Sequence, residues 1–148
     1  MQKIFIASDH GGYNLKEKIK DVFSKLGYEF EDFGTSSTAS CDYPVFAKKV
    51  AQKVQETKGR GILVCGTGIG MSIVANKFKN IRASHCTDTF SARMTREHND
   101  SNILCLGERI TGQDLALDIV KIWLETPFSN GERHLNRLNM INEIETEK

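Results

Sequence analysis

GILVCGTGIGMS, residues 61–72, is the stretch that decides the expected fold, because the apolar run Ile62 to Val64 leads directly into three closely spaced glycines. A short apolar run before a glycine-rich turn and a helical segment is typical of a buried parallel strand whose carboxyl end meets a ligand. Cys65 stands at the start of this turn. A loop that only cradles a cofactor needs no nucleophile or base there, so the cysteine requires a chemical explanation.

Apolar runs alternate with helix-period segments on both sides of this stretch. Strands are predicted over 4–7, 28–33, 61–64, 81–85 and 103–106, and helices over 14–26, near 72–78, over 89–97, over 113–124 and from Pro44 onward. Asn14 and Glu17 predict a capping box, and Gly27 predicts the end of that first helix. Because the strands are short and mostly apolar, we expect helices on both faces of the sheet. The sequence predicts an α/β fold, a three-layer α/β/α Rossmann-like domain with a five-stranded parallel sheet.

Length and composition restrict the class of partner. The 148 residues favour a single domain over residues 1–148. The net charge is +1, with 20 Lys and Arg against 19 Asp and Glu, so neither nucleic acid nor a membrane is a predicted partner. The cysteines, at 41, 65, 86 and 105, have neither CxxC nor zinc spacing, which predicts no metal site and no disulfide framework. No apolar stretch reaches membrane-spanning length, and the expected location is the cytoplasm.

The segment from Gly131 onward carries apolar residues at three-residue spacing: Leu135, Leu138, Ile141 and Ile144. This spacing predicts an amphipathic helix with a narrow apolar stripe. The stripe could pack on its own domain, or the C-terminal helix could dock on a partner subunit.

Three functional interpretations compete for the glycine-rich turn. A dinucleotide fingerprint is disfavoured, because the spacing is GxGxG, the turn follows the third strand and no second domain would hold a substrate, although Asp88 lies at the expected distance. The second interpretation is a phosphate loop with a catalytic cysteine. Its first form, a Cys-x5-Arg phosphatase, is disfavoured because the arginine position holds Met71. A phosphocarrier domain with a phosphoryl-carrying cysteine needs only backbone donors, so it stays open.

The third interpretation is an anion cradle for an enolate. Gly66, Gly68 and Gly70 precede a helix and can aim several backbone N–H groups at one point. An enediolate formed from a sugar needs such donors, and it needs a base beside the carbon that loses its proton. Cys65 is adjacent, and a helix amino terminus stabilises a thiolate. A tight turn with a buried, inert cysteine is the structural alternative.

Other polar residues follow the predicted strands, where ligands of open α/β sheets bind. They are Asp9 and His10, Asp42 and Tyr43, Thr87 and Asp88, and Glu108 and Arg109. Arg133 and Arg137 share one helix face and could hold a phosphate together or form a solvated basic face. His98 and Asn99 precede the fifth strand, so they belong to the opposite sheet edge; they are either structural or reach the site of another chain.

Five stretches in the same order resemble the ribose-5-phosphate isomerase B family, which shares its fold with galactose-6-phosphate isomerase subunits: IASDHGGYNLK, DYPVFA, GILVCGTGIGMSIVANK, SARMTREHNDSNILCLGERI and GERHLNR. The resemblance covers nearly the whole chain. It implies an aldose–ketose isomerase, an intramolecular oxidoreductase without metal or cofactor, that interconverts ribose 5-phosphate and ribulose 5-phosphate through a cis-enediolate in the pentose phosphate pathway. It also implies a homodimer or a dimer of dimers with active sites at the subunit boundary.

The resemblance implies a role for each matching residue. Cys65 would be the base that moves a proton between C2 and C1, Thr67 would shuttle protons on the substrate oxygens, and His98 would open the furanose ring. The remaining residues would contact the substrate. The backbone of Gly66, Gly68, Ile69 and Gly70 would bind the enediolate together with Asn99, and Asp9 and His10 would bind the sugar. Tyr43 would line the pocket, and Arg109, Arg133 and Arg137 would bind the phosphate.

Two details qualify the resemblance. Gly12 precedes Tyr13 where the family often has alanine, and some branches replace the cysteine base by a glutamate slightly later in the loop, where this chain has Gly70-Met71-Ser72. The cysteine branch is therefore the match. The alternatives are an allose-6-phosphate or galactose-6-phosphate isomerase, as one subunit, and a non-catalytic phosphocarrier or phosphosugar-binding module.

Overall fold

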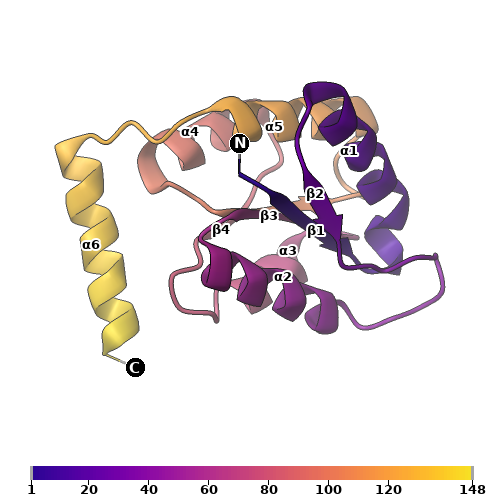
Figure 1. Cartoon of the computed structure of the whole chain (residues 1–148), viewed down its shortest axis with the longest axis horizontal. Helices are drawn as coiled ribbons and strands as arrows, with labels where there is room; N and C mark the ends of the chain where they lie inside the picture. The colour runs from indigo at the N-terminus through magenta and orange to yellow at the C-terminus, as the bar shows by residue number, and fades with distance from the viewer. Residues whose placement is uncertain (1, 148) are drawn as a thin grey trace.

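The computed structural model describes residues 2–147 and contains one five-stranded sheet with helices on both faces (Figure 1). The strands are β1 (Ile4–Ser8), β2 (Phe30–Asp32), β3 (Arg60–Cys65), β4 (Ala83–His85) and β5 (Ile103–Gly107). The helices are α1 (Tyr13–Leu26), α2 (Tyr43–Thr57), α3 (Ile69–Ala75), α4 (Thr89–Asn99), α5 (Gln113–Glu125) and α6 (Glu132–Thr146), with a short 3-10 helix η1 (His10–Gly12) before α1. The predicted α/β/α arrangement is confirmed.

All neighbouring strands are parallel, in the order β2-β1-β3-β5-β4. Ile62 in β3 lies opposite Ile6 in β1 and Leu104 in β5, so β3 is central. The strand order reverses between β1 and β3, because β2 is added on one side of this pair and β5 and β4 on the other. A crevice outside the carboxyl ends of two such strands is the usual ligand site of an open α/β sheet.

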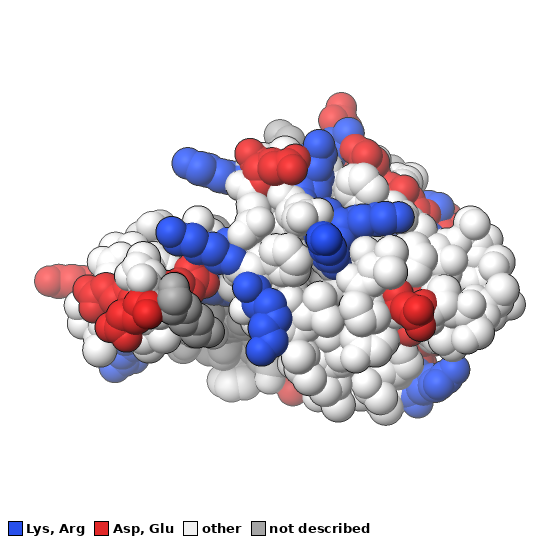
Figure 2. Space-filling view, turned by 90° about the horizontal axis from the view of Figure 1, so that it is seen from below, with Lys and Arg blue, Asp and Glu red and all other residues white. Residues whose placement is uncertain are grey.

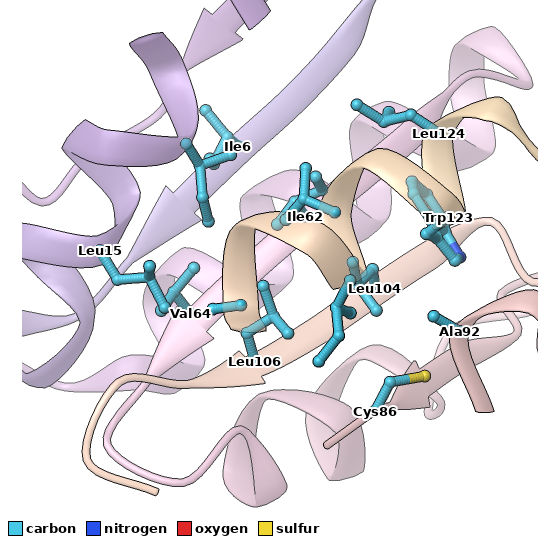
Figure 3. Packing of buried hydrophobic residues seen from close by; sticks show 14 of the residues in the cluster. Ile6, Leu15, Ile62, Val64, Cys86, Ala92, Leu104, Leu106, Trp123 and Leu124 are labelled. Carbon is cyan, nitrogen blue, oxygen red and sulfur yellow. The ribbon is translucent and has the colours of Figure 1, made fainter. Parts of the chain in front are cut away.

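The two faces of the sheet carry separate hydrophobic clusters. One is covered by α1, α4 and α5 and includes Ile6, Ile62, Leu104 and Trp123 (Figure 3). The other is covered by α2 and α3 and includes Ala7, Leu63, Met71 and Cys105. Alternate residues of each strand enter opposite clusters, which explains why the strands read as uninterrupted apolar runs.

Two helices begin earlier than the sequence indicated. α1 starts at Tyr13, so the predicted capping box at Asn14 is wrong; the chain enters α1 directly from η1, and Gly12 supplies no side-chain cap. The backbone N–H of Leu15 instead donates to the Glu108 carboxylate over 2.6 Å, from a loop 93 residues away. α3 starts at Ile69, three residues earlier than expected, because the glycine turn passes straight into it.

α6 stands beside the rest of the chain (yellow in Figure 1) and packs against α4. Leu138 of the predicted stripe is buried, whereas Leu135, Ile141 and Ile144 are exposed. Packing within the chain therefore covers only part of the stripe.

The surface on the side of α2 and α3 mixes acidic and basic side chains without a continuous basic region (Figure 2). This distribution agrees with the net charge of +1. Within residues 2–147, no helix combines the length and the hydrophobicity that crossing a bilayer requires.

A buried ion pair fixes the loop that leads to α2. The Lys16 side chain is only 1% exposed, and its Nζ donates to both Asp32 carboxylate oxygens (2.9 and 2.7 Å) and to the Thr35 carbonyl (2.7 Å). Burial tends to raise the pKa of Asp32, but hydrogen bonds from Lys16, the Gly34 N–H and Lys20 outweigh it and hold the pKa below its usual range. Folding is therefore favoured by the ionised carboxylate.

We predict that Asp32→Asn lowers the free energy of unfolding by about 1.5–3 kcal/mol at pH 7, because it removes the charge-assisted hydrogen bonds of buried Lys16 and leaves only the partly exposed Glu17, 3.7 Å away, as its counter-charge. Urea unfolding at fixed protein concentration measures the loss, and Glu31→Gln, which removes an exposed pair with Lys3, is the matched control. Since the folded pKa is depressed, the contribution is complete above the unfolded pKa of about 3.9 and lost as pH falls through the folded value. An unchanged difference between variant and wild type at pH 2 would contradict this account.

Candidate active site

An open cleft of about 440 Å³ lies outside the carboxyl ends of β1, β3 and β5. It is lined by Asp9, Tyr43, Cys65, Gly66, Thr67, Ile69, Gly70, Ile73 and Arg109. These residues come from four separate segments, which meet because parallel strands end at a common edge. The cleft thus brings together eight predicted site residues: seven that lie at or after the ends of strands, and Tyr43 at the start of α2.

The turn between β3 and α3 is shaped by glycines at positions where a side chain would not fit. Gly68 has φ +81°, a left-handed conformation that favours glycine. A Cβ on Gly107, at the end of β5, would lie 2.5 Å from the backbone carbonyl of Thr67. The turn therefore rests directly on the backbone of β5, which fixes its height above the sheet.

Cys65 sits at the boundary between the core and the cleft. It is 5% exposed and packs with Ala7, Met71 and Cys105, yet it lines the cleft. Its Sγ accepts a hydrogen bond from the backbone N–H of Gly68 over 3.1 Å. The turn therefore aims one backbone donor at the sulfur that lines the cleft.

Two further backbone N–H groups belong to the residues that line the cleft, Ile69 and Gly70. The Ile69 N–H donates to Thr67 Oγ1 over 3.2 Å, while the Gly70 N–H lies in the first turn of α3, where no intrahelical acceptor exists. A Cβ on Gly70 would lie 2.7 Å from the ring of Tyr43, so the absence of a side chain lets this ring close over the turn. The cleft thus combines a sulfur, a hydroxyl and a free amide within one loop.

Asp9 and Arg109 bound the cleft, and His10 lies beside it. Asp9 is buried, and one of its carboxylate oxygens accepts the Gly11 N–H over 2.9 Å, so part of its role is to shape η1. The Nδ1 of His10 accepts the backbone N–H of Cys41 over 3.2 Å, which assigns the proton of the neutral ring to Nε2. The Arg109 side chain lies over Gly66, 3.3 Å from the position of a Cβ there.

The other three thiols have different surroundings. Burial, with a smaller effect of Asp88, raises the pKa of Cys86 to about 11. Burial also raises the pKa of Cys105, and the neighbouring Cys65 and Cys86 add to it. Cys41 is partly exposed, with its sulfur 3.9 Å from His10 Nδ1. Cys86 and Cys105 are therefore protonated core thiols, and Cys65 is the thiol that faces the cleft.

The remaining predicted site residues form a second group away from this cleft, where α4 meets α6. The rings of His98 and His134 stack with centroids 4.3 Å apart. Burial and the positive charges of His98, Arg133 and Arg137 lower the pKa of His134, in that order. Asn99 lies at the amino-terminal edge of the sheet, where its carbonyl accepts from Arg82 Nε over 2.9 Å.

His134 is a member of this second group that its sequence position did not reveal. It is 8% exposed, and its ring stacks on the ring of His98. A histidine between two arginines on an amphipathic helix was the only signal available. Within residues 2–147, no three His, Cys, Asp or Glu side chains gather as metal ligands would.

Known proteins share this sequence and fold over nearly their whole length. The family model described as Ribose/Galactose Isomerase matches residues 4–141. The structure of Clostridium thermocellum ribose-5-phosphate isomerase B is 57% identical, with 98% of each chain covered and a TM-score of 0.95. Escherichia coli ribose-5-phosphate isomerase B is 45% identical, covering 98% of this chain and 97% of its own length.

A third relative was solved with a sugar phosphate. Mycoplasma genitalium ribose-5-phosphate isomerase B with bound ribulose-5-phosphate is 37% identical, with 99% of this chain and 97% of that chain covered and a TM-score of 0.94. The matched model, the identities and the superposed folds agree. The chain belongs to the ribose/galactose isomerase family.

Proposed function

We propose that this protein is an aldose–ketose isomerase that interconverts D-ribose 5-phosphate and D-ribulose 5-phosphate. The observation that carries the proposal is the Sγ of Cys65, which lines the cleft while accepting the Gly68 N–H. Family membership supports the same activity, as do the relatives that bear this name. No step of the proposed chemistry is assigned to a metal or a cofactor.

The chemistry requires two proton movements on neighbouring carbons. The Cys65 thiolate takes the proton from C2 of the open-chain aldose, and the electron pair forms the C1–C2 double bond while the C1 carbonyl becomes an enediolate oxygen. The thiol then returns a proton to C1, and the proton of the C2 hydroxyl leaves to form the ketone. Thr67 Oγ1 transfers protons between the two oxygens, and the turn from Gly66 to Gly70 stabilises the negative charge.

Binding the phosphate requires cationic side chains, and opening the sugar ring requires an acid or base. This cleft contains only some of these groups. Arg109 is its one lining cation. We propose that His98 opens the furanose ring, that Asn99 binds the intermediate and that Arg133 and Arg137 bind the phosphate, all from a second copy of the chain. Asp9 and His10 contact the sugar, and Tyr43 lines the pocket.

Exposed apolar side chains beside the cleft support docking of a second copy there. Ile69 and Ile73, which line the cleft, are 50% and 56% exposed, and Val45 next to Tyr43 is 50% exposed. The exposed stripe of α6 offers a second apolar surface. A homodimer that covers both would bring His98 of one chain to Cys65 of the other, and such dimers could pair further.

A hexose phosphate isomerase is the second candidate, because the description of the family names galactose as well as ribose. We predict a higher kcat/KM for ribose 5-phosphate than for allose 6-phosphate or galactose 6-phosphate when the purified chain acts alone. Side-by-side kinetics measure this preference. Activity on a six-carbon substrate only, or only with a different partner chain, would favour the hexose candidate.

We predict that Cys65→Ser lowers kcat by about 10²–10⁴-fold with a small change in KM, because it removes the base and leaves the binding groups in place. Cys41→Ser is the matched control, since it removes a partly exposed thiol but keeps the backbone N–H that bonds His10, and it should retain most of the activity. If both variants kept full activity, or both lost it equally, Cys65 would not be the base.

Mixing two inactive variants tests the shared site. Cys65→Ala and His98→Ala should each be inactive alone, whereas exchanged dimers should regain about a quarter of the wild-type sites, because half of the dimers are mixed and each mixed dimer has one intact site. Activity is measured after subunit exchange has been verified with a tagged chain. Complete absence of recovery would place His98 and Cys65 in the same chain's site.

A further inference from the structure

A second pocket, of about 390 Å³, opens at the amino-terminal edge of the sheet. Its charged lining consists of Lys58, Arg60, Arg82, Arg96 and Asp100, and we call it the edge pocket. These residues lie at the beginnings of β3, β4 and β5, whereas the Cys65 cleft lies at the strand ends. Along β3 the two are separated by five residue steps, roughly 17 Å. The edge pocket is therefore distinct from the cleft.

The edge pocket contains more positive than negative charge. Asp100 is its one carboxylate and is shared by Arg82 (3.6 Å) and Arg96 (2.9 Å). Arg60 donates to the Leu124 carbonyl and Arg96 to the Thr126 carbonyl, both at the end of α5. Carbonyls at the ends of α4 and α5 supply about half a negative charge each. An excess of about two positive charges remains.

Arg60 is the least compensated of the three guanidiniums, because Arg82 and Arg96 both pair with Asp100. Within residues 2–147 it makes no salt bridge, and its buried Nε has no hydrogen-bond partner. Burial, and then the positive charge of Arg96, lower the pKa of its guanidinium. Both guanidiniums lie near the ring of Trp123, at 5.3 and 5.9 Å from its centroid. Of these two guanidiniums only Arg96 has a carboxylate partner, Asp100, so the charge of Arg60 favours the binding of an anion.

We propose that the edge pocket binds a small phosphorylated anion, held by Lys58, Arg60, Arg82 and Arg96. A phosphate monoester carries about −1.5 to −2 charges at pH 7 and three acceptor oxygens, which matches the excess charge and the guanidinium donors. The volume lies within the range of small-molecule sites. The carboxylate of Glu145, which accepts the N–H of Asn80 in the lining, offsets part of this positive charge. Through Arg82 the bound anion is connected to Asn99.

Trp123 provides a signal specific to this pocket, because it is the one tryptophan of the chain and lies beside Arg60 and Arg96. Titration with inorganic phosphate, with chloride at equal ionic strength as the reference, should change its fluorescence in a saturable way. Arg60→Met, which keeps a long apolar side chain near Trp123, and Lys58→Gln, which changes only an exposed side chain, should each weaken the apparent affinity by about tenfold or more. Lys121→Gln, exposed on α5, is the control and should bind like the wild type.

Two further experiments distinguish organic from inorganic phosphate, and the edge pocket from the Cys65 cleft. Ribitol 5-phosphate, which lacks the carbonyl, tests organic phosphates; tighter binding than inorganic phosphate would assign the pocket to sugar phosphates, and equal binding would assign it to the phosphate group alone. Arg133→Gln, which removes a proposed phosphate-binding group of the active site and lies outside the edge pocket, should leave the titration unchanged even though isomerisation is impaired. The proposal is overturned if neither compound changes the emission beyond chloride, or if Arg60→Met and Lys58→Gln both titrate like the wild type.

Discussion

The hydrogen bond from the Gly68 N–H to the Cys65 sulfur connects the end of β3 to the first turn of α3, and the candidate chemistry depends on it. It forms because Gly68 adopts a left-handed conformation that few other residues tolerate, and because Gly107 lets the turn rest on the backbone of β5. The same contacts that close the hydrophobic core thus place a thiol at its boundary. A sulfur deeper in the core would be inert, as Cys105 is, and a sulfur on the surface would lack the oriented donor.

The distribution of polar groups divides the molecule into two chemically different edges. The carboxyl ends of the strands carry the sulfur, the hydroxyl of Thr67 and the carboxylate of Asp9, whereas the amino-terminal edge carries the guanidiniums of Arg60, Arg82 and Arg96. In their own chain, His98 and the arginines of α6 line neither the Cys65 cleft nor the edge pocket. This separation is what a site completed by a second chain requires, and it leaves the edge pocket free for a different anion.

Sequence patterns predicted most of the fold because its strands and helix ends depend mainly on residues that are neighbours in the sequence. The apolar runs gave all five strands and the glycine at 27 gave the end of α1, since burial and backbone freedom act on neighbouring residues. The start of α1 was missed because its cap comes from Glu108, which no local pattern connects to Leu15. Cys65 and its turn were identifiable from glycine spacing. The stacking of His134 on His98 was not, because it depends on how α6 crosses α4.

Isomerisation in heavy water tests the central claim most directly. If the Cys65 thiol carries the proton between C2 and C1, ribulose 5-phosphate formed early in the reaction should contain solvent deuterium at C1, since a thiol proton exchanges with water. Deuterium exchange at C2 of the recovered ribose 5-phosphate should disappear together with turnover in Cys65→Ala. Product that retains the original C2 hydrogen at C1 in full, formed at the wild-type rate, would contradict the account, because it would mean direct transfer between the carbons without a base.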